Sequence, residues 1–197
     1  MTLPLFPLRT VLFPGGLLPL RVFEQRYIAL AKTCLRDDRP FGVCLIRDGA
    51  EVMGPDRAVP AFAPVGTLAR IVDFDMPEPG ILHLRSRGES RFRVVSHRVA
   101  ADGLVVGETT AIADEAAVPL PADCRPLAQL VELIARRIGP LRFPTPVQPD
   151  DASWIGYRLA ESLPLPLSVR QSMLEINDAA LRLQVLRRFL QQQGLVA

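Results

Sequence analysis

The sequence has few of the residues that carry most enzyme chemistry. Lys32 is its only lysine, its only histidines are His83 and His97, and its three cysteines form no CxxC pair. Neither histidine lies at a recognised metal-ligand spacing from a cysteine or an acidic residue. The spacing therefore predicts no metal site, no cofactor site and no catalytic constellation, although residues distant in sequence can meet in a fold.

Long apolar runs are also missing. The longest uncharged run covers residues 58–69 and contains two prolines and a glycine, whereas a membrane-spanning helix needs about 18 apolar residues. Pro4, Pro7 and Arg9 interrupt the N-terminal segment, which therefore lacks the unbroken apolar core of a secretory signal. The odd number of cysteines favours buried free thiols in a reducing compartment. We therefore expect a cytoplasmic protein that does not bind membranes.

Neither sign of charge is in large excess. The 23 Lys and Arg residues against 21 Asp and Glu residues give a net charge of +2 at pH 7, so no global attraction to nucleic acid or anionic membrane is implied. Hydrophobic residues make up 49% of the chain, which is ordinary for a globular protein. A length of 197 residues suffices for one large domain or two small ones.

Short apolar segments separated by turn-forming residues predict strands over the first hundred residues. Residues 3–6 and 17–22 flank Gly15 and Gly16, a pair suited to a tight reversal. Pro19 cannot donate a backbone hydrogen bond, so the strand that contains it is expected at a sheet edge or a bulge. Further strands are predicted at residues 41–47, 65–75, 81–87, 91–97 and 104–110, a spacing typical of a small barrel or sandwich.

Helical periodicity appears once within this series and dominates after it. Residues 24–35 place Tyr27, Leu30, Ala31 and Cys34 on one apolar face. Residues 111–121 have the composition of a linker, and four helical segments are predicted beyond them. These are a helix that begins at an Asp123 cap, a short helix at 152–162, a helix that begins at the capping box of Ser168, and a last helix at 178–193.

This order of elements predicts an α+β protein, with a β-barrel in residues 1–115 and a helical bundle in residues 120–197. The segment "LPLFPLRTVLFPGGLLPLRVFEQRY" at residues 3–27 closely resembles the opening of the Lon protease N-terminal domain. The later segments "FGVCLI", "VGTLARIVDF", "GESRFRV" and "WIGYRLAESLPLPLSVRQSMLEINDAALRLQVL" also resemble that family, in the same order. The resemblance implies a PUA-like β-barrel followed by a C-terminal α-helical bundle, in agreement with the periodicity.

The resemblance does not extend to the catalytic parts of a Lon protease, which are an ATPase domain and a Ser–Lys protease domain. Lys32 lies in "ALAKTCL", without the glycines that hold nucleotide phosphates in a P-loop. We therefore expect a stand-alone binding module that is not an enzyme. Glu24 and Arg26 of the family motif are expected to hold the strand–helix junction through charge-assisted hydrogen bonds. The acidic segment 73–80 is expected to be a solvated loop.

The resemblance implies that the module recognises polypeptide, because the Lon N-terminal domain is associated with substrate recognition. The expected ligands are unfolded or apolar segments of client proteins, or a protease partner, in protein quality control. The edge strand at 17–22 could accept an added strand, and exposed apolar side chains beside it would add affinity. The candidate contact residues are Phe13, Leu17, Phe23, Tyr27 and Trp154. The oligomeric state is left open.

RNA binding is the alternative function. The segment "HLRSRGESRFR" supplies Arg85, Arg87, Arg91 and Arg93 around a turn predicted at Gly88. If both strands of this hairpin direct these side chains outward, four guanidinium groups line one surface and suit phosphate contacts. The small net charge and the lack of interleaved aromatic residues argue against this function.

Overall fold

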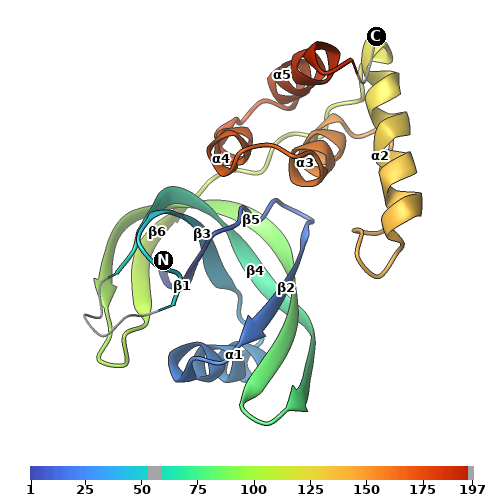
Figure 1. Cartoon of the computed structure of the whole chain (residues 1–197). Helices are drawn as coiled ribbons and strands as arrows, with labels where there is room; N and C mark the ends of the chain where they lie inside the picture. The colour runs from blue at the N-terminus through green and yellow to red at the C-terminus, as the bar shows by residue number, and fades with distance from the viewer. Residues whose placement is uncertain (53–58, 195–197) are drawn as a thin grey trace. The chain divides into compact units, whose positions relative to one another are not determined.

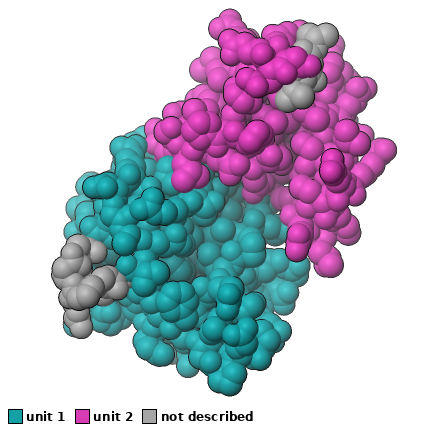
Figure 2. All heavy atoms as spheres, viewed as in Figure 1, with its two compact units in different colours: residues 1–113 teal, residues 114–197 magenta. Residues whose placement is uncertain are grey.

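The computed structural model describes residues 1–52 and 59–194 of the chain. The chain forms two compact units, residues 1–113 and residues 114–197, which Figure 2 shows in different colours. We call them the barrel unit and the helical unit. The first contains a mixed β-sheet and the second contains helices, so the predicted α+β class is confirmed.

A six-stranded sheet makes up most of the barrel unit (Figure 1). The strand order is β2-β5-β4-β3-β1-β6, and an additional pairing of β5 with β6 closes five of the strands into a ring. β2 lies outside this ring and pairs with β5. The elements of the unit are β1 (Thr2–Leu8), β2 (Leu17–Val22), α1 (Gln25–Asp37), β3 (Phe41–Asp48), β4 (Ala61–Glu78), β5 (Ile81–Val99) and β6 (Val105–Ala111).

β5 is one continuous strand of 19 residues, so the two shorter strands and the turn predicted at Gly88 are wrong. Gly88 is present because another segment crosses close to it. A Cβ atom at this position would lie 2.2 Å from the carbonyl oxygen of Phe13. The Gly15 amide donates to the Gly88 oxygen at 2.8 Å, and the Gly88 amide donates to the Gly16 oxygen at 2.9 Å. The glycine therefore serves close packing of two backbones.

The crossing segment is the turn at Phe13–Gly16. The Gly16 amide donates to the Phe13 carbonyl at 2.9 Å, and Gly15 has a φ of 74°, a conformation that favours glycine. The tight reversal predicted here is confirmed, but it does not join a pair of neighbouring strands. β1 pairs with β3 and β6, while β2 pairs with β5, because the turn packs onto β5 instead of closing a hairpin.

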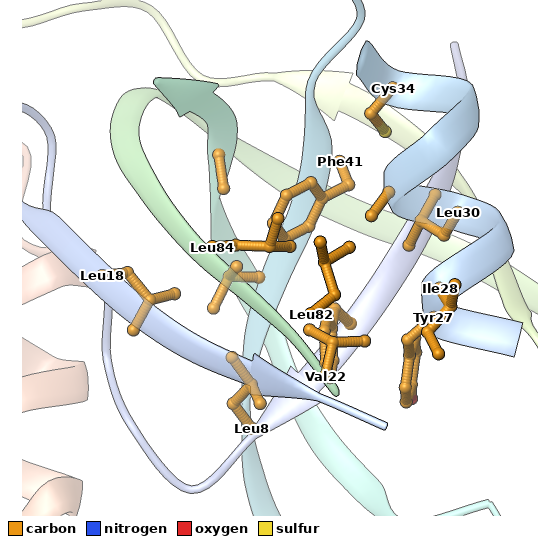
Figure 3. Packing of buried hydrophobic residues seen from close by; sticks show 14 of the residues in the cluster. Leu8, Leu18, Val22, Tyr27, Ile28, Leu30, Cys34, Phe41, Leu82 and Leu84 are labelled. Carbon is orange, nitrogen blue, oxygen red and sulfur yellow. The ribbon is translucent and has the colours of Figure 1, made fainter. Parts of the chain in front are cut away.

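The core of the barrel unit joins α1 to the sheet, as Figure 3 shows. The predicted apolar face of α1 is confirmed, since its four residues are buried, together with Ile28. In Figure 3 this face points toward Val22 of β2 and Leu82 of β5. The rings of Phe6 and Tyr27 stack at 3.7 Å between centroids. The helix therefore closes one side of the barrel core through apolar contacts that stabilise by burial.

The helical unit consists of a 3-10 turn at Ala122–Cys124 followed by four helices. They are α2 (Arg125–Ile138), α3 (Ala152–Ser162), α4 (Leu167–Glu175) and α5 (Ala179–Gln192). None of the helices in the described part of the chain is long and apolar enough to cross a membrane. The Asp151 carboxylate caps α3, because it accepts hydrogen bonds from the Ser153 and Trp154 amides at 2.8 and 3.0 Å.

Two predicted caps of this unit are wrong. Asp123 lies in the 3-10 turn before α2 and does not cap it, since its carboxylate accepts a hydrogen bond from Arg187 of α5 at 2.5 Å. Ser168 lies inside the first turn of α4, which begins directly after Pro166. Pro166 is the N-cap residue, so the cap predicted at Ser168 is displaced by two residues.

A buried ion pair joins the start of the helical unit to its helices. The Arg182 guanidinium donates to both carboxylate oxygens of Glu115, one of them at 3.0 Å. Its remaining donors reach the carbonyl oxygens of Met173 at 3.0 Å and Ile176 at 2.6 Å. The Glu115 carboxylate also accepts from Ser153 at 2.6 Å and Tyr157 at 2.8 Å. The Arg182 side chain is fully buried and that of Glu115 is 6% exposed.

Candidate functional site

β2 is an edge strand, as predicted from Pro19. Among the described residues it pairs with β5 alone, so its other edge has no strand partner. Leu18 and Val22 are buried while Pro19 and Arg21 are exposed, so these side chains alternate between the two faces of the strand. Such an edge presents backbone donors and acceptors that an added strand can satisfy, apart from the donor that Pro19 lacks.

An apolar face extends from β2 across the neighbouring strands. Leu84 of β5 lies opposite Leu20 of β2 on one side and opposite Phe74 of β4 on the other. Residues directly opposite one another share a face of a sheet. Leu20 is half-buried, whereas Phe74 is 58% exposed. We call Leu20 and Phe74 the edge face.

The acidic segment expected to be a loop is part of this sheet. Residues 73–78 belong to β4 and pair with β5, so the loop prediction is wrong. Val72, Phe74 and Met76 alternate with acidic residues and are each about half exposed. This period of two continues the strand predicted at residues 65–75 and could have extended it to residue 78, and the exposed apolar side chains are functional candidates that the sequence reasoning missed.

A pocket of about 160 Å³ opens where β2 ends. The stacked rings of Phe6 and Tyr27 belong to its lining, and Phe23 is an exposed part of it. The pKa of Tyr27 is raised to about 12, chiefly by burial, which the Arg26 charge opposes and the Glu24 and Glu51 charges reinforce. The phenol is therefore neutral at physiological pH. The lining residues are Phe6, Arg21, Val22, Phe23, Glu24, Tyr27, Glu51 and Val52.

Arg26 holds the junction between β2 and α1 beside this pocket. Its guanidinium forms an ion pair with Glu24 at 3.0 Å and donates to the Gly103 carbonyl at 2.9 Å. It also lies 4.3 Å from the centroid of the Tyr27 ring. The expected charge-assisted contacts of Glu24 and Arg26 at the junction are therefore present. The network fixes the orientation of Tyr27 and hence of the pocket wall.

The candidate contact residues fall into different environments. Phe13 is fully buried, and Tyr27, 4% exposed, reaches the surface through the pocket. Leu17 is half-buried and Phe23 is 53% exposed, so these two are accessible on β2 and directly after it. Trp154 belongs to α3 of the helical unit, where its half-buried ring meets Phe143 edge-on at 6.0 Å. The accessible candidates of the barrel unit therefore gather along β2.

The four arginines do not line one surface. The hairpin predicted for them is wrong, because all four belong to the single strand β5. Arg91 is 2% exposed, so its side chain points into the protein. Arg85 lies 3.0 Å from Asp73 in an ion pair, while Arg87 and Arg93 are exposed. The outward row of four guanidinium groups that the hairpin would have formed is therefore not present, because Arg91 is buried.

The histidines are on β5, and the three cysteines are buried without a disulfide. His83 is half-buried on β5, opposite Arg21 and Asp75, and the exposed His97 contacts the Phe62 ring at 5.0 Å between centroids. No group of three His, Cys, Asp or Glu residues suited to a metal ion occurs among the residues that the structure describes. The three cysteines are buried and free, and burial raises the pKa of each thiol.

Comparison with known proteins gives consistent matches over most of the chain. Residues 2–192 match the model of the ATP-dependent protease La (LON) substrate-binding domain. Lon protease 2 of Myxococcus xanthus is 43% identical over 94 residues, which are 47% of this chain and 11% of that protein. The Lon protease of Anaeromyxobacter dehalogenans is 27% identical over 97% of this chain and 23% of that protein. The chain thus spans less than a quarter of the length of either relative.

Solved structures agree with these sequence matches. The structure of a Lon N-terminal domain protein from Xanthomonas campestris is 41% identical and has a TM-score of 0.77, covering 95% of this chain and 98% of that one. The N-terminal domain of a Mycobacterium avium complex Lon protease shares the fold at 16% identity, with a TM-score of 0.58 over 94% of this chain and 96% of that one. The chain belongs to the family of the ATP-dependent protease La (LON) substrate-binding domain.

Proposed function

We propose that the chain is a non-catalytic module that binds unfolded or apolar polypeptide segments in cytoplasmic protein quality control. The family it belongs to is described as substrate-binding, and the curated relatives are proteases of which the chain spans the substrate-binding part alone. Binding would retain a client, or bring it to a separate protease, without any bond being made or broken by this chain.

The observation that carries the proposal is the edge of β2 that has no strand partner among the described residues, with the exposed Phe23 and the pocket directly after it. An extended client segment can pair with the edge through backbone hydrogen bonds, which do not depend on side-chain identity. The edge face then adds apolar contact, at about 25 cal/mol per Å² of surface removed from water. This combination gives broad recognition of unfolded chains, because only extended, partly apolar segments satisfy both contacts.

Suppression of aggregation tests the proposal. A chemically unfolded client is diluted into buffer with and without the purified chain, and light scattering is followed over time. We expect suppression that Phe23→Ser weakens, because that residue is 53% exposed beside the β2 edge. Val95→Ser is the matched control, since Val95 is 69% exposed on β5 and does not line the pocket. If both variants suppressed aggregation equally well, the β2 edge would not be the binding surface. If the parent chain did not suppress aggregation at all, the proposed function would be wrong.

A further inference from the structure

We infer that the pocket at the end of β2 is a subsite for one apolar side chain of the bound polypeptide, and that Glu51 makes this subsite favour a basic residue next to that side chain. The inference rests on the proposed function and assigns it a side-chain preference. It follows from the size of the pocket, its position on the strand edge and the charges at its rim.

The volume of the pocket limits what it can hold. Its volume of about 160 Å³ is close to the roughly 150 Å³ of an apolar cavity that accommodates one benzene molecule. The wall is formed by the Phe6–Tyr27 stack and by Val22, which is 2% exposed. A Leu, Met or Phe side chain therefore fits, whereas two such side chains do not.

The position of the pocket explains why one side chain would enter it. Val22 is the last residue of β2, and both it and Phe23 line the pocket. A strand added to the free edge of β2 would therefore run past the pocket mouth. Because successive side chains of a strand point to opposite faces, one residue can insert while its neighbours stay at the rim.

The rim carries one carboxylate without an ion-pair partner among the described residues. Glu24 is neutralised by Arg26 at 3.0 Å, and Arg21 lies 3.9 Å from Glu78. Glu51 instead accepts a hydrogen bond from the Arg9 backbone amide at 3.3 Å. The Arg9 guanidinium donates to the Gly49 carbonyl at 2.6 Å. Glu51 is thus a rim carboxylate that no guanidinium pairs with among the described residues, and at the neighbouring position of a bound segment it attracts Lys or Arg and repels Asp or Glu.

The test is a titration of the isotope-labelled full chain with short Gly/Ser peptides, followed by NMR shifts of backbone amides. Four peptides carry Leu-Arg, Leu-Ser, Leu-Glu or Ala-Arg at their centre. We expect Leu-Arg to shift residues that line the pocket, and Ala-Arg to bind at least tenfold more weakly because it leaves the pocket unfilled. Leu-Glu should bind about fivefold more weakly than Leu-Arg at low salt, with the difference shrinking at 1 M salt.

The variant Glu51→Gln should remove the difference between Leu-Arg and Leu-Glu while Leu-Ser binding is unchanged. Glu108→Gln is the control, since Glu108 lies on β6 outside the pocket lining. Equal affinity of Leu-Arg and Leu-Glu for the parent chain, or a preference that survives Glu51→Gln, would overturn the inference and leave the proposed function standing. If no peptide changed the NMR shifts of the pocket residues, the inference would also be wrong. The aggregation assay would then decide separately whether the proposed function holds.

Discussion

Replacing Glu115 by Gln should destabilise the helical unit by about 3–5 kcal/mol, the usual cost of leaving one partner of a buried ion pair without the other. The change is nearly isosteric, so it removes charge without opening a cavity. Arg182 is fully buried and would keep its two backbone acceptors, but it would lose the opposite charge and one of its two side-chain acceptors. The amide of Gln would also direct a donor toward Arg182, Ser153 or Tyr157, each of which donates in the parent chain.

Urea unfolding followed by the fluorescence of Trp154 measures this effect, because Trp154 is the only tryptophan and lies on α3 of the same unit. Glu132→Gln is the matched control. Glu132 lies 3.7 Å from Arg136 on α2, in an ion pair whose side chains are 39% and 80% exposed, and exposed pairs contribute less than about 1 kcal/mol. A free energy of unfolding for Glu115→Gln within 1 kcal/mol of the control would refute the reasoning.

The same ion pair predicts a pH dependence. Burial raises the pKa of Glu115, but hydrogen bonds from Arg182, Ser153 and Tyr157 outweigh it, and the net pKa lies below the usual 4.5. A carboxyl group whose folded pKa is depressed stabilises the protein above its unfolded pKa. Its contribution is therefore complete above about pH 4.5 and is lost as the pH falls through the folded pKa. In Glu115→Gln, stability measured from pH 7 downward should fall less steeply over this interval than in the parent chain.

Three further substitutions test the packing. Gly88→Ala should lower the free energy of unfolding, measured with urea, by about 2–4 kcal/mol, because its Cβ would clash with the Phe13 carbonyl oxygen. A decrease below about 1 kcal/mol would contradict the close approach of these two backbones. Ser86→Ala should raise the free energy of unfolding by up to about 1 kcal/mol, since this fully buried hydroxyl has no hydrogen-bond partner within the described residues. A clearly lower thermal midpoint would contradict this prediction, because it would mean that the hydroxyl is hydrogen-bonded. Asp151→Ala should lower the free energy of unfolding by about 1 kcal/mol, because the N-cap of α3 is lost. An unchanged thermal midpoint would contradict a stabilising role of this cap.

The sequence was most informative where local rules and tertiary packing agree. The bounds of β2 and the buried face of α1 follow from periodicity, and Pro19 alone indicates an edge strand. Gly88 is an example of a residue whose role could not be predicted from the sequence. A glycine is found both in turns and where another backbone comes close, and only the position of the Phe13–Gly16 turn in the fold distinguishes the two roles.

The candidate site was only partly predictable for a related reason. Strict alternation along β5 would direct the Arg91 side chain outward, yet both Arg91 and Phe92 are buried. The reason is a register shift in the pairing of β4 with β5 between Gly88 and Arg91. A register shift changes which face a side chain occupies and leaves no sequence signal of its own. Leu17 and Phe23 were identified because they adjoin a proline-marked edge. The pocket, in contrast, depends on Glu51, which is distant from them in sequence.

The pairing of β1 with β6 has a consequence for how the barrel forms on the ribosome. Leu3 pairs with Gly107 and Thr2 with Glu108, so about a hundred residues have to be synthesised after β1 before its second neighbour, β6, exists. Contacts of such long sequence separation slow folding and leave apolar strands exposed meanwhile. A chain with the proposed function would thus itself resemble one of its ligands during its own synthesis.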